Sequence, residues 1–307
     1  MRRVWISTIV GVLVLPVALT LPVLVTGKEA EKATQGMLDT AGIERAIGKA
    51  GEAKGDVYKL SLPRTDLQVT VDNVQVKPGF ALGSWIAFKP AAHGAVAHGD
   101  LVLAEQEVPL VVQALEAHGI RMTALHNHLI GESPHVMFLH FWGEGDAADL
   151  AQHLRDALSR TKTPMTDAKK PETSAEPAGF DPAQIQAALG HKGTVKQGVL
   201  QVSVPRSEPV MESGVELPPS MGTATAINVQ AAGADKVAAT GDFVMTAEEV
   251  NRVAGALTKH GIQITALHNH LLHVAPNVYF MHFWAHDSTD HVAQGLRAAL
   301  DAMKGNP

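Results

Sequence analysis

Residues 118–142 read HGIRMTALHNHLIGESPHVMFLHFW, and residues 260–284 read HGIQITALHNHLLHVAPNVYFMHFW. The two stretches are identical at 16 of 25 positions and lie 142 residues apart. The same shift aligns two shorter blocks without a gap, residues 61–64 with 203–206 and residues 99–100 with 241–242. Self-similarity at a fixed spacing indicates an internal duplication, and two copies favour a pseudo-twofold pair over a solenoid.

The duplication also predicts the domain organisation. We place the first repeat at residues 42–160 and the second at residues 181–302. Between them, residues 161–180 are rich in Pro, Thr, Lys and Ala, which is typical of an extended, solvated linker. A polar lead-in, residues 28–41, precedes the first repeat, and a short tail, residues 303–307, follows the second.

Each repeat shows the same order of strand and helix patterns. Val108, Val111, Val112 and Leu115 follow the i, i+3, i+4, i+7 spacing of an amphipathic helix. Residues 121–129 and 136–142 are predicted to form the two strands of a β-hairpin. The fold class we expect is α+β: two tandem homologous repeats in a pseudo-twofold arrangement, each an antiparallel sheet with a β-hairpin and packed helices.

Composition narrows the chemistry. The chain has 307 residues, a formal net charge of −6 and no cysteine. A globally basic nucleic-acid binder is therefore not expected. Disulfides, iron–sulfur clusters and thiolate zinc sites are excluded, because all of them need cysteine. The chain does contain 16 histidines.

The N-terminus has the pattern of a targeting segment. Arg2 and Arg3 precede an apolar run over residues 4–25. We interpret residues 1–27 as a cleaved signal peptide or as an uncleaved N-terminal anchor. Both alternatives predict an extracytoplasmic protein, periplasmic or secreted. Contact with the membrane is expected only through this segment, and only if it stays uncleaved.

Histidines in the repeated hairpin are the main candidates for a site. His126 and His128 alternate along a predicted strand, so both side chains are expected on one face. His140 lies on the partner strand, and the hairpin register decides whether it shares that face. Three imidazoles with an open position suit Zn²⁺ or copper. The second repeat carries the same set as His268, His270 and His282.

A structural role for these histidines is the alternative. Buried imidazoles can hydrogen-bond to the backbone and fix a hairpin onto its helices, and a duplicated sequence also retains core residues. The two roles differ in what replacing His126 and His268 would do: loss of metal in one case, loss of stability in the other.

Three further polar residues recur in both repeats and are secondary candidates. Asp100 follows Gly99, where turn chemistry would suffice, or it could serve as an oxygen ligand or a general base. Glu107 is expected at the third position of a helix, where a capping role would suffice. Arg64 ends a strand and could contact an anion, although a solvated surface position or a structural ion pair is favoured. Their counterparts are Asp242, Glu249 and Arg206.

The hairpin and its upstream elements resemble the LppY/LpqO family, also called the DUF1259 domain. The motifs that carry the resemblance in the first repeat are residues 123–128, Pro134, Phe138, residues 140–142, residues 99–100 and residues 84–85. The resemblance covers residues 42–302 almost completely and implies an exported bacterial protein, but no particular reaction. The chain lacks the lipid-attachment cysteine of the lipoprotein members. In the gap-free alignment the second repeat has Ile227-Asn228 where the first has Trp85-Ile86.

Taken together, the sequence predicts a non-catalytic exported binding protein, with a His-lined site in each repeat or one shared between them. The ligand is a small molecule or a metal ion, with zinc and copper as the candidate metals. One alternative is a metal-dependent hydrolase that uses His126, His128 and His140, assisted by Asp100 or Glu107. Another is a structural interaction module of the cell envelope without a small ligand.

Overall fold

The computed structural model describes residues 38–165 and 178–304, which belong to one compact unit. The predicted N-terminal segment (1–27), most of the lead-in, the middle of the predicted linker and the last three residues lie outside the described residues. Within the described ranges, no helix is both long and apolar enough to cross a membrane.

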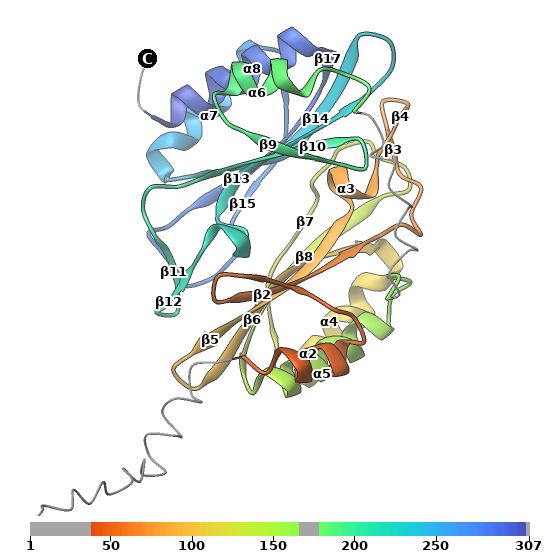
Figure 1. The fold of residues 1–307 in the computed structure, drawn as a ribbon, viewed down its shortest axis with the longest axis vertical. Coiled ribbons are helices and arrows are strands. Elements are labelled where there is room, and N and C mark those ends of the chain that lie inside the picture. Colours follow the sequence, from red (N-terminus) through yellow and green to blue (C-terminus); the bar gives the residue numbers. More distant parts are fainter. Residues whose placement is uncertain (1–37, 166–177, 305–307) are drawn as a thin grey trace, which may run out of the picture. The chain divides into compact units, whose positions relative to one another are not determined.

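The first repeat forms a six-stranded antiparallel sheet in the order β1-β2-β5-β6-β8-β7 (Figure 1). Its elements are α2 (Thr40–Ile47), β1 (Glu52–Lys54), β2 (Val57–Pro63), β3 (Thr70–Val71), β4 (Val74–Gln75), α3 (Pro78–Ala81), β5 (Gly83–Ala91), β6 (Gly94–Ala104), the 3-10 helix η1 (Glu105–Glu107), α4 (Val108–Ala117), β7 (Arg121–His126), β8 (Val136–Gly145) and α5 (Ala147–Ser159).

The second repeat forms a six-stranded antiparallel sheet in the corresponding order, β9-β10-β13-β14-β17-β15. Its elements are α6 (Pro182–Leu189), β9 (Gly193–Lys196), β10 (Val199–Pro205), β11 (Val210–Glu212), β12 (Val215–Leu217), the 3-10 helix η2 (Pro219–Met221), β13 (Ala224–Ala231), β14 (Lys236–Met245), α7 (Ala247–Lys259), β15 (Gln263–His268), β16 (Val274–Ala275), β17 (Tyr279–Ser288) and α8 (Thr289–Met303). The expected α+β fold of two equivalent repeats is confirmed.

Helices cover one face of each sheet, because alternate strand residues on that face are apolar. In the first repeat, α2, α4 and α5 bury this face in a cluster that includes Leu60, Leu101 and Phe141. In the second, α6, α7 and α8 do the same over Val202, Phe243 and other residues. Asp39, Asp146, Asp181 and Ser288 cap α2, α5, α6 and α8, and Thr246 with Glu249 forms a capping box on α7.

The opposite faces of the two sheets meet each other. Segments that interrupt each sheet reach across to the other repeat: Val71 and Phe80 pack with Trp284, while Val210 and Met221 pack with Trp142. The two apolar clusters correspond in part under the 142-residue shift, for example at Phe138 and Phe280 and at Trp142 and Trp284. They flank a polar interior, which is where the candidate site lies.

The predicted hairpin is shorter than the sequence suggested. β7 ends at His126, whereas the alternation pattern extended the strand to residue 129. The chain leaves the sheet there because Asn127 turns toward the other repeat and donates to the carbonyl oxygens of Leu129 and Thr265, at 2.8 and 3.1 Å. Side-chain bonds to the backbone of this kind compete with the strand ladder.

Candidate metal centre

His126 and His140 lie on the same face of the first sheet. The register pairs His126 with Phe138 and Ala124 with His140, and directly opposite residues share a face. His128 was expected on the strand, but it lies in the loop after β7. That loop is fixed to the second repeat, because Thr265 donates its hydroxyl to the His128 carbonyl oxygen at 2.6 Å. Thr123 makes the equivalent bond to His270 at 2.6 Å.

The six predicted histidines form one cluster between the two repeats. Three stacked pairs each join one repeat to the other, with ring centroids 3.5 Å apart for His126 and His268, 3.7 Å for His128 and His282, and 3.8 Å for His140 and His270. His126 and His268 are equivalent residues of the two repeats, and they face each other. The 142-residue shift converts the pair of His128 and His282 into the pair of His270 and His140. The pseudo-twofold axis therefore passes between His126 and His268.

The Nε2 atoms of all six histidines are buried and have no hydrogen-bond partner among the described residues. In three rings, Nδ1 lies against a backbone carbonyl oxygen: Asn127 for His126, Asn269 for His268 and Gly241 for His282, at 3.2, 3.2 and 3.1 Å. Because a carbonyl only accepts, Nδ1 must donate in these rings. Their Nε2 atoms then carry the lone pair that a metal ion binds.

Two groups of these nitrogens are close enough to share an ion. His126, His128 and His140 form one, and His126, His268, His270 and His282 form the other, with ligand atoms within 4.8 Å of one another in each. The second group contains the symmetry equivalents of the first. Phe138 and Phe280 stack on His128 and His270, with centroids 3.4 and 3.5 Å apart, and fix the planes of these rings.

Burial keeps five of the imidazoles neutral. It lowers the pKa of His126 to about 3 and that of His268 to about 4, and neighbouring histidines add to both shifts. Burial likewise lowers the pKa values of His128, His140 and His270 well below the ordinary value. Neutral imidazole is the form that coordinates metals, so these five rings are ready to bind without losing protons.

Asp100 and Asp242 face the cluster from the middle of β6 and β14. The prediction that Asp100 lies at a turn is wrong, since β6 continues from Gly94 to Ala104. Gly99 is required there because a Cβ would lie 2.4 Å from the Trp85 carbonyl oxygen. Asp100 lies 3.9 Å from the Nε2 atoms of both His128 and His140.

The two carboxyl groups differ in their contacts and therefore in their pKa values. Burial, reinforced by the charge of Asp242, raises the pKa of Asp100 well above its ordinary value. Burial also acts to raise the pKa of Asp242. It is outweighed by His282, whose Nδ1 lies 2.6 Å from the Asp242 carboxylate, and the pKa of Asp242 is lowered. Asp100 can therefore hold a proton beside the cluster, whereas Asp242 carries a charge.

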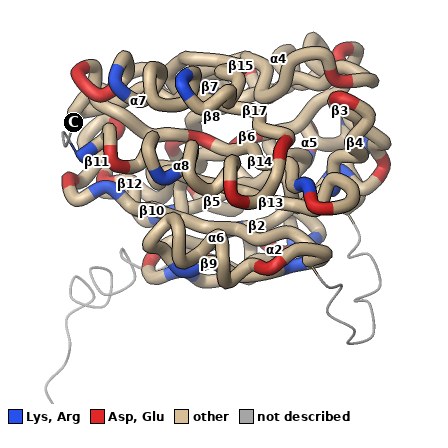
Figure 2. Tube along the Cα trace, turned by 90° about the horizontal axis from the view of Figure 1, so that it is seen from above, with Lys and Arg blue, Asp and Glu red and all other residues tan. Residues whose placement is uncertain are grey.

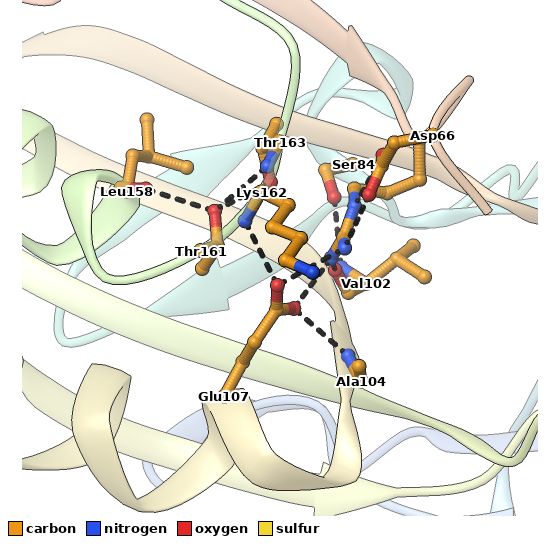
Figure 3. A network of polar contacts seen from close by, with 10 residues as sticks. Asp66, Ser84, Val102, Ala104, Glu107, Leu158, Thr161, Lys162 and Thr163 are labelled. Carbon is orange, nitrogen blue, oxygen red and sulfur yellow. Dashed lines mark hydrogen bonds and ion pairs between the residues drawn. The ribbon is translucent and has the colours of Figure 1, made fainter.

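The remaining secondary candidates lie outside the cluster. Arg64 is fully buried and donates to Glu107 at 2.7 Å and to Asp66 at 2.9 Å (Figure 3). Glu107 also accepts from the backbone N–H groups of Ala104 and Lys162, at 2.9 and 2.8 Å. This network joins strand ends to η1 and the start of the predicted linker. Arg206 and Glu249 form the equivalent pair at 2.8 Å. None of the four residues reaches the histidines.

A cavity that the sequence analysis missed opens between the two sheets and reaches the cluster. It has a volume of about 790 Å³, and its lining includes Lys59, Trp85 and Asp100 from the first repeat and His282 from the second. His98 lies on the same face, since it is opposite Trp142 on β8. One sequence pattern could have indicated these residues. Along strands β2, β5 and β6, polar residues such as Lys59 and His98 alternate with apolar residues of the core.

Comparison with known proteins identifies the family. The family described as Domain of Unknown Function (DUF1259) matches residues 41–160 and 183–302. The chain belongs to the DUF1259 family. It carries two tandem copies of the DUF1259 domain, and the six histidines are three from each copy. A comparison with curated proteins found no match.

Two solved structures show weak similarity to this DUF1259 protein. The trimeric bacterial microcompartment shell protein PduB is 12% identical, with 83% of this chain and 90% of that chain covered and a TM-score of 0.23. EtuB from Clostridium kluyveri is also 12% identical, with 84% and 90% covered and a TM-score of 0.20. Similarity at this level carries no argument about function.

Proposed function

We propose that this DUF1259 protein binds zinc or copper ions between its two repeats, at two three-histidine sites related by the pseudo-twofold axis. The observation that carries the proposal is the set of six buried Nε2 atoms, none with a hydrogen-bond partner among the described residues. In folded proteins a buried polar group without a partner is unusual and calls for an explanation.

Energetics favour a ligand over a purely structural role. Each buried nitrogen that lacks a partner costs about 1–3 kcal/mol. A core that served packing alone would be more stable with apolar side chains of similar shape. Coordination to a metal ion would satisfy the Nε2 lone pair, and the bonds from Nδ1 to backbone carbonyls orient three of the rings, as carbonyl oxygens do for the histidines of metal sites.

The chemical type of the candidate ligand atoms limits which metal ions can bind. Imidazole nitrogens suit zinc and copper, while calcium and magnesium prefer oxygen ligands. Three imidazoles also leave a coordination position open. The two groups of close ligand atoms support one ion for each repeat, with His126 and His268 adjacent at the axis.

Metal content of tag-free protein tests the proposal. The informative variant is His126→Asn combined with His268→Asn, because the asparagine amide can keep the bond to the backbone carbonyl but offers no lone pair in place of Nε2. We expect two metal ions per chain in the wild type, by elemental mass spectrometry after loading and dialysis, and none in the double variant.

The matched control is His118→Asn combined with His153→Asn. These two rings also stack, at a centroid distance of 4.1 Å, but His118 directly follows α4 and His153 lies on α5, away from the cluster. The control should keep its full metal content. Equal metal in both double variants, or none in the wild type, would contradict the proposal.

A metal-dependent hydrolase is the second candidate, and Asp100 is the observation that favours it. The Asp100 carboxyl group has a raised pKa and lies 3.9 Å from two candidate ligands, so it would be placed to hold or release a proton beside the ion, which would itself supply the activation of water. Turnover of nitrophenyl esters by the zinc-loaded protein, lost in Asp100→Asn with zinc retained, would favour the enzyme. Metal binding without turnover favours a binding protein.

The N-terminal sequence supports a location outside the cytoplasm. Arg2 and Arg3 followed by the apolar residues 4–25 have the pattern of an export signal. We expect N-terminal sequencing of the protein from its native host to begin near Lys28. An intact N-terminus in the membrane fraction would instead show an anchor, and recovery from the cytoplasm would contradict export.

A further inference from the structure

The cavity between the sheets runs from one edge of the two sheets toward the other. β1 and β9 are the edge strands at its outer end, and β7 and β15 are the edge strands at the opposite end, where the histidines lie. Figure 2 shows β7 and β15 at one end of the stacked strands and β9 at the other. The cavity therefore offers a route from the surface to the proposed metal sites.

Lysines from both repeats line the outer part of this route. Lys49, Lys54 and Lys59 come from the first repeat, and Lys196 comes from the second. The acidic residue among them, Glu52, is bonded to Lys54 at 3.0 Å. Since the whole chain is acidic, with a net charge of −6, a lysine-rich entrance is a local reversal of charge. Such an entrance attracts anions.

Lys59 is the cation that lies deepest. Its Nζ donates to the Ser220 carbonyl oxygen at 2.8 Å and lies 3.9 Å from the centre of the Trp85 ring. Burial lowers its pKa to about 8, with Lys54 adding to the shift, so the ammonium is still mostly charged at neutral pH. The shift is limited by the neighbouring Asp100 carboxyl group, which acts in the opposite direction on the pKa of Lys59.

The walls of the cavity are not equivalent. Under the repeat symmetry, Gln201 of β10 takes the place of Lys59. The register places Ala226, opposite Asp242, where the first repeat has Trp85 opposite Asp100. The gap-free alignment of Trp85 with Ile227 is thus wrong by one residue. Only the wall of the first repeat combines a lysine with the Trp85 ring, and this combination suits a ligand that is anionic and partly apolar.

We infer that the cavity admits a small organic anion of the carboxylate class, held between the Lys59 ammonium and the open coordination position of a histidine-bound metal ion. This inference rests on the proposed metal sites. A volume of about 790 Å³ is far larger than an inorganic ion needs and lies within the usual range for organic ligands. Trp85, Phe80 and Phe138 supply apolar lining for its carbon skeleton.

Cobalt(II) substitution with acetate as the probe tests the inference. The visible absorption of histidine-bound cobalt changes when an anion enters the open position. We expect a saturable change with acetate and none with acetamide, its uncharged counterpart. Lys59→Gln, which introduces the residue that the second repeat has, should weaken acetate binding about 10-fold or more at unchanged cobalt content.

Two variants make the result specific. Lys59→Arg keeps the charge and should retain most of the acetate affinity, while Lys236→Gln removes an exposed lysine at the start of β14 and should change nothing. Full cobalt content without an acetate response, or equal affinity in Lys59→Gln, would overturn the anion site and leave the metal sites standing. A failure to bind cobalt would overturn both.

Discussion

Two sets of buried polar residues are duplicated in this protein, and they differ in how their atoms are satisfied. In the first repeat, Arg64 is bonded on each guanidinium nitrogen, to Glu107, Asp66 and the Val102 carbonyl oxygen. In the second, Arg206 is bonded to Glu249 and to the Val244 carbonyl oxygen, while its Nε has no partner among the described residues. The histidine cluster has six Nε2 atoms without a partner among the described residues. Repetition in the sequence is the same for both sets, so repetition alone does not distinguish structure from function. The number of buried nitrogens without a partner does distinguish them: among the described residues it is one in the two arginines and six at Nε2 in the histidine cluster.

The Arg–Glu network should show the largest effect on stability and none on metal content. Arg64→Ala leaves Glu107 buried and unpaired, which we expect to cost about 3–5 kcal/mol in the free energy of unfolding. Arg206→Ala should cost less, because the Arg206 and Glu249 side chains keep 11% and 13% of their surface exposed. Urea unfolding in the presence of a chelator measures both. Loss of metal from folded Arg64→Ala would break the distinction between the two sets.

The pH dependence of the unfolding free energy, measured on the metal-free protein, tests a third kind of buried polar residue. His98 is buried, and its Nδ1 is bonded to the Phe141 carbonyl oxygen at 2.9 Å. Burial lowers the pKa of His98 to about 4, so between pH 6.5 and 4 the unfolded state binds the extra proton. The contribution of His98 to the unfolding free energy is therefore complete above pH 6.5. It falls by about 3 kcal/mol as the pH is lowered toward 4.

The matched variant is His98→Thr, since Thr240 occupies the equivalent position opposite Trp284 in the second repeat. Its unfolding free energy should fall less steeply over this pH range than that of the wild type. Equal slopes for the two proteins would show that His98 does not carry this share of the acid sensitivity.

The sequence predicted the repeat, the sheet with its covering helices and the six histidines of the site. These features could be predicted because the alternation of a strand and the period of a helix are visible within short segments of sequence. The meeting of the two histidine sets at one axis could not be predicted. It depends on how the sheets dock, and bonds such as that from Thr123 to the His270 carbonyl join residues 147 apart.

Other differences have local causes. The strand that was expected to carry His128 stops at His126, because Asn127 bonds to the opposite repeat rather than continuing the ladder. Lys59 and Trp85 were not selected, since a cavity between two sheets leaves no periodic signal. Arg64 was expected on the surface or in a structural ion pair, and burial against Glu107 decides for the ion pair.

Metal binding to the folded protein should raise its stability as the zinc concentration rises. The contribution of the Arg–Glu pairs should not depend on zinc. At a free zinc concentration 100 times the Kd, we expect a gain in the unfolding free energy of about 3 kcal/mol for each site, which is about 5 kcal/mol for the two sites. Thermal unfolding with and without zinc measures the gain. It should disappear in the His126→Asn, His268→Asn double variant and persist in Arg206→Ala. A gain of the same size in the double variant would place the zinc elsewhere.

The smallest effect is expected from the bonds that fix the histidine loops. Thr123→Val and Thr265→Val each remove a hydroxyl that donates to a histidine carbonyl at 2.6 Å. Each should cost about 1 kcal/mol in stability. Because the loops hold His128 and His270, metal affinity should fall as well, as a competition assay with a chromogenic chelator would show. Unchanged affinity would mean that the loops need no such support.

Anomalous X-ray diffraction from crystals of the zinc- or copper-loaded protein, recorded at the metal's absorption edge, tests the central claim most directly. The account predicts two peaks between the repeats, related by the pseudo-twofold axis, each about 2.0–2.1 Å from the Nε2 atoms of three histidines. Peaks bound only to surface residues such as His118 and His153, or no peak beside His126 and His268, would contradict it.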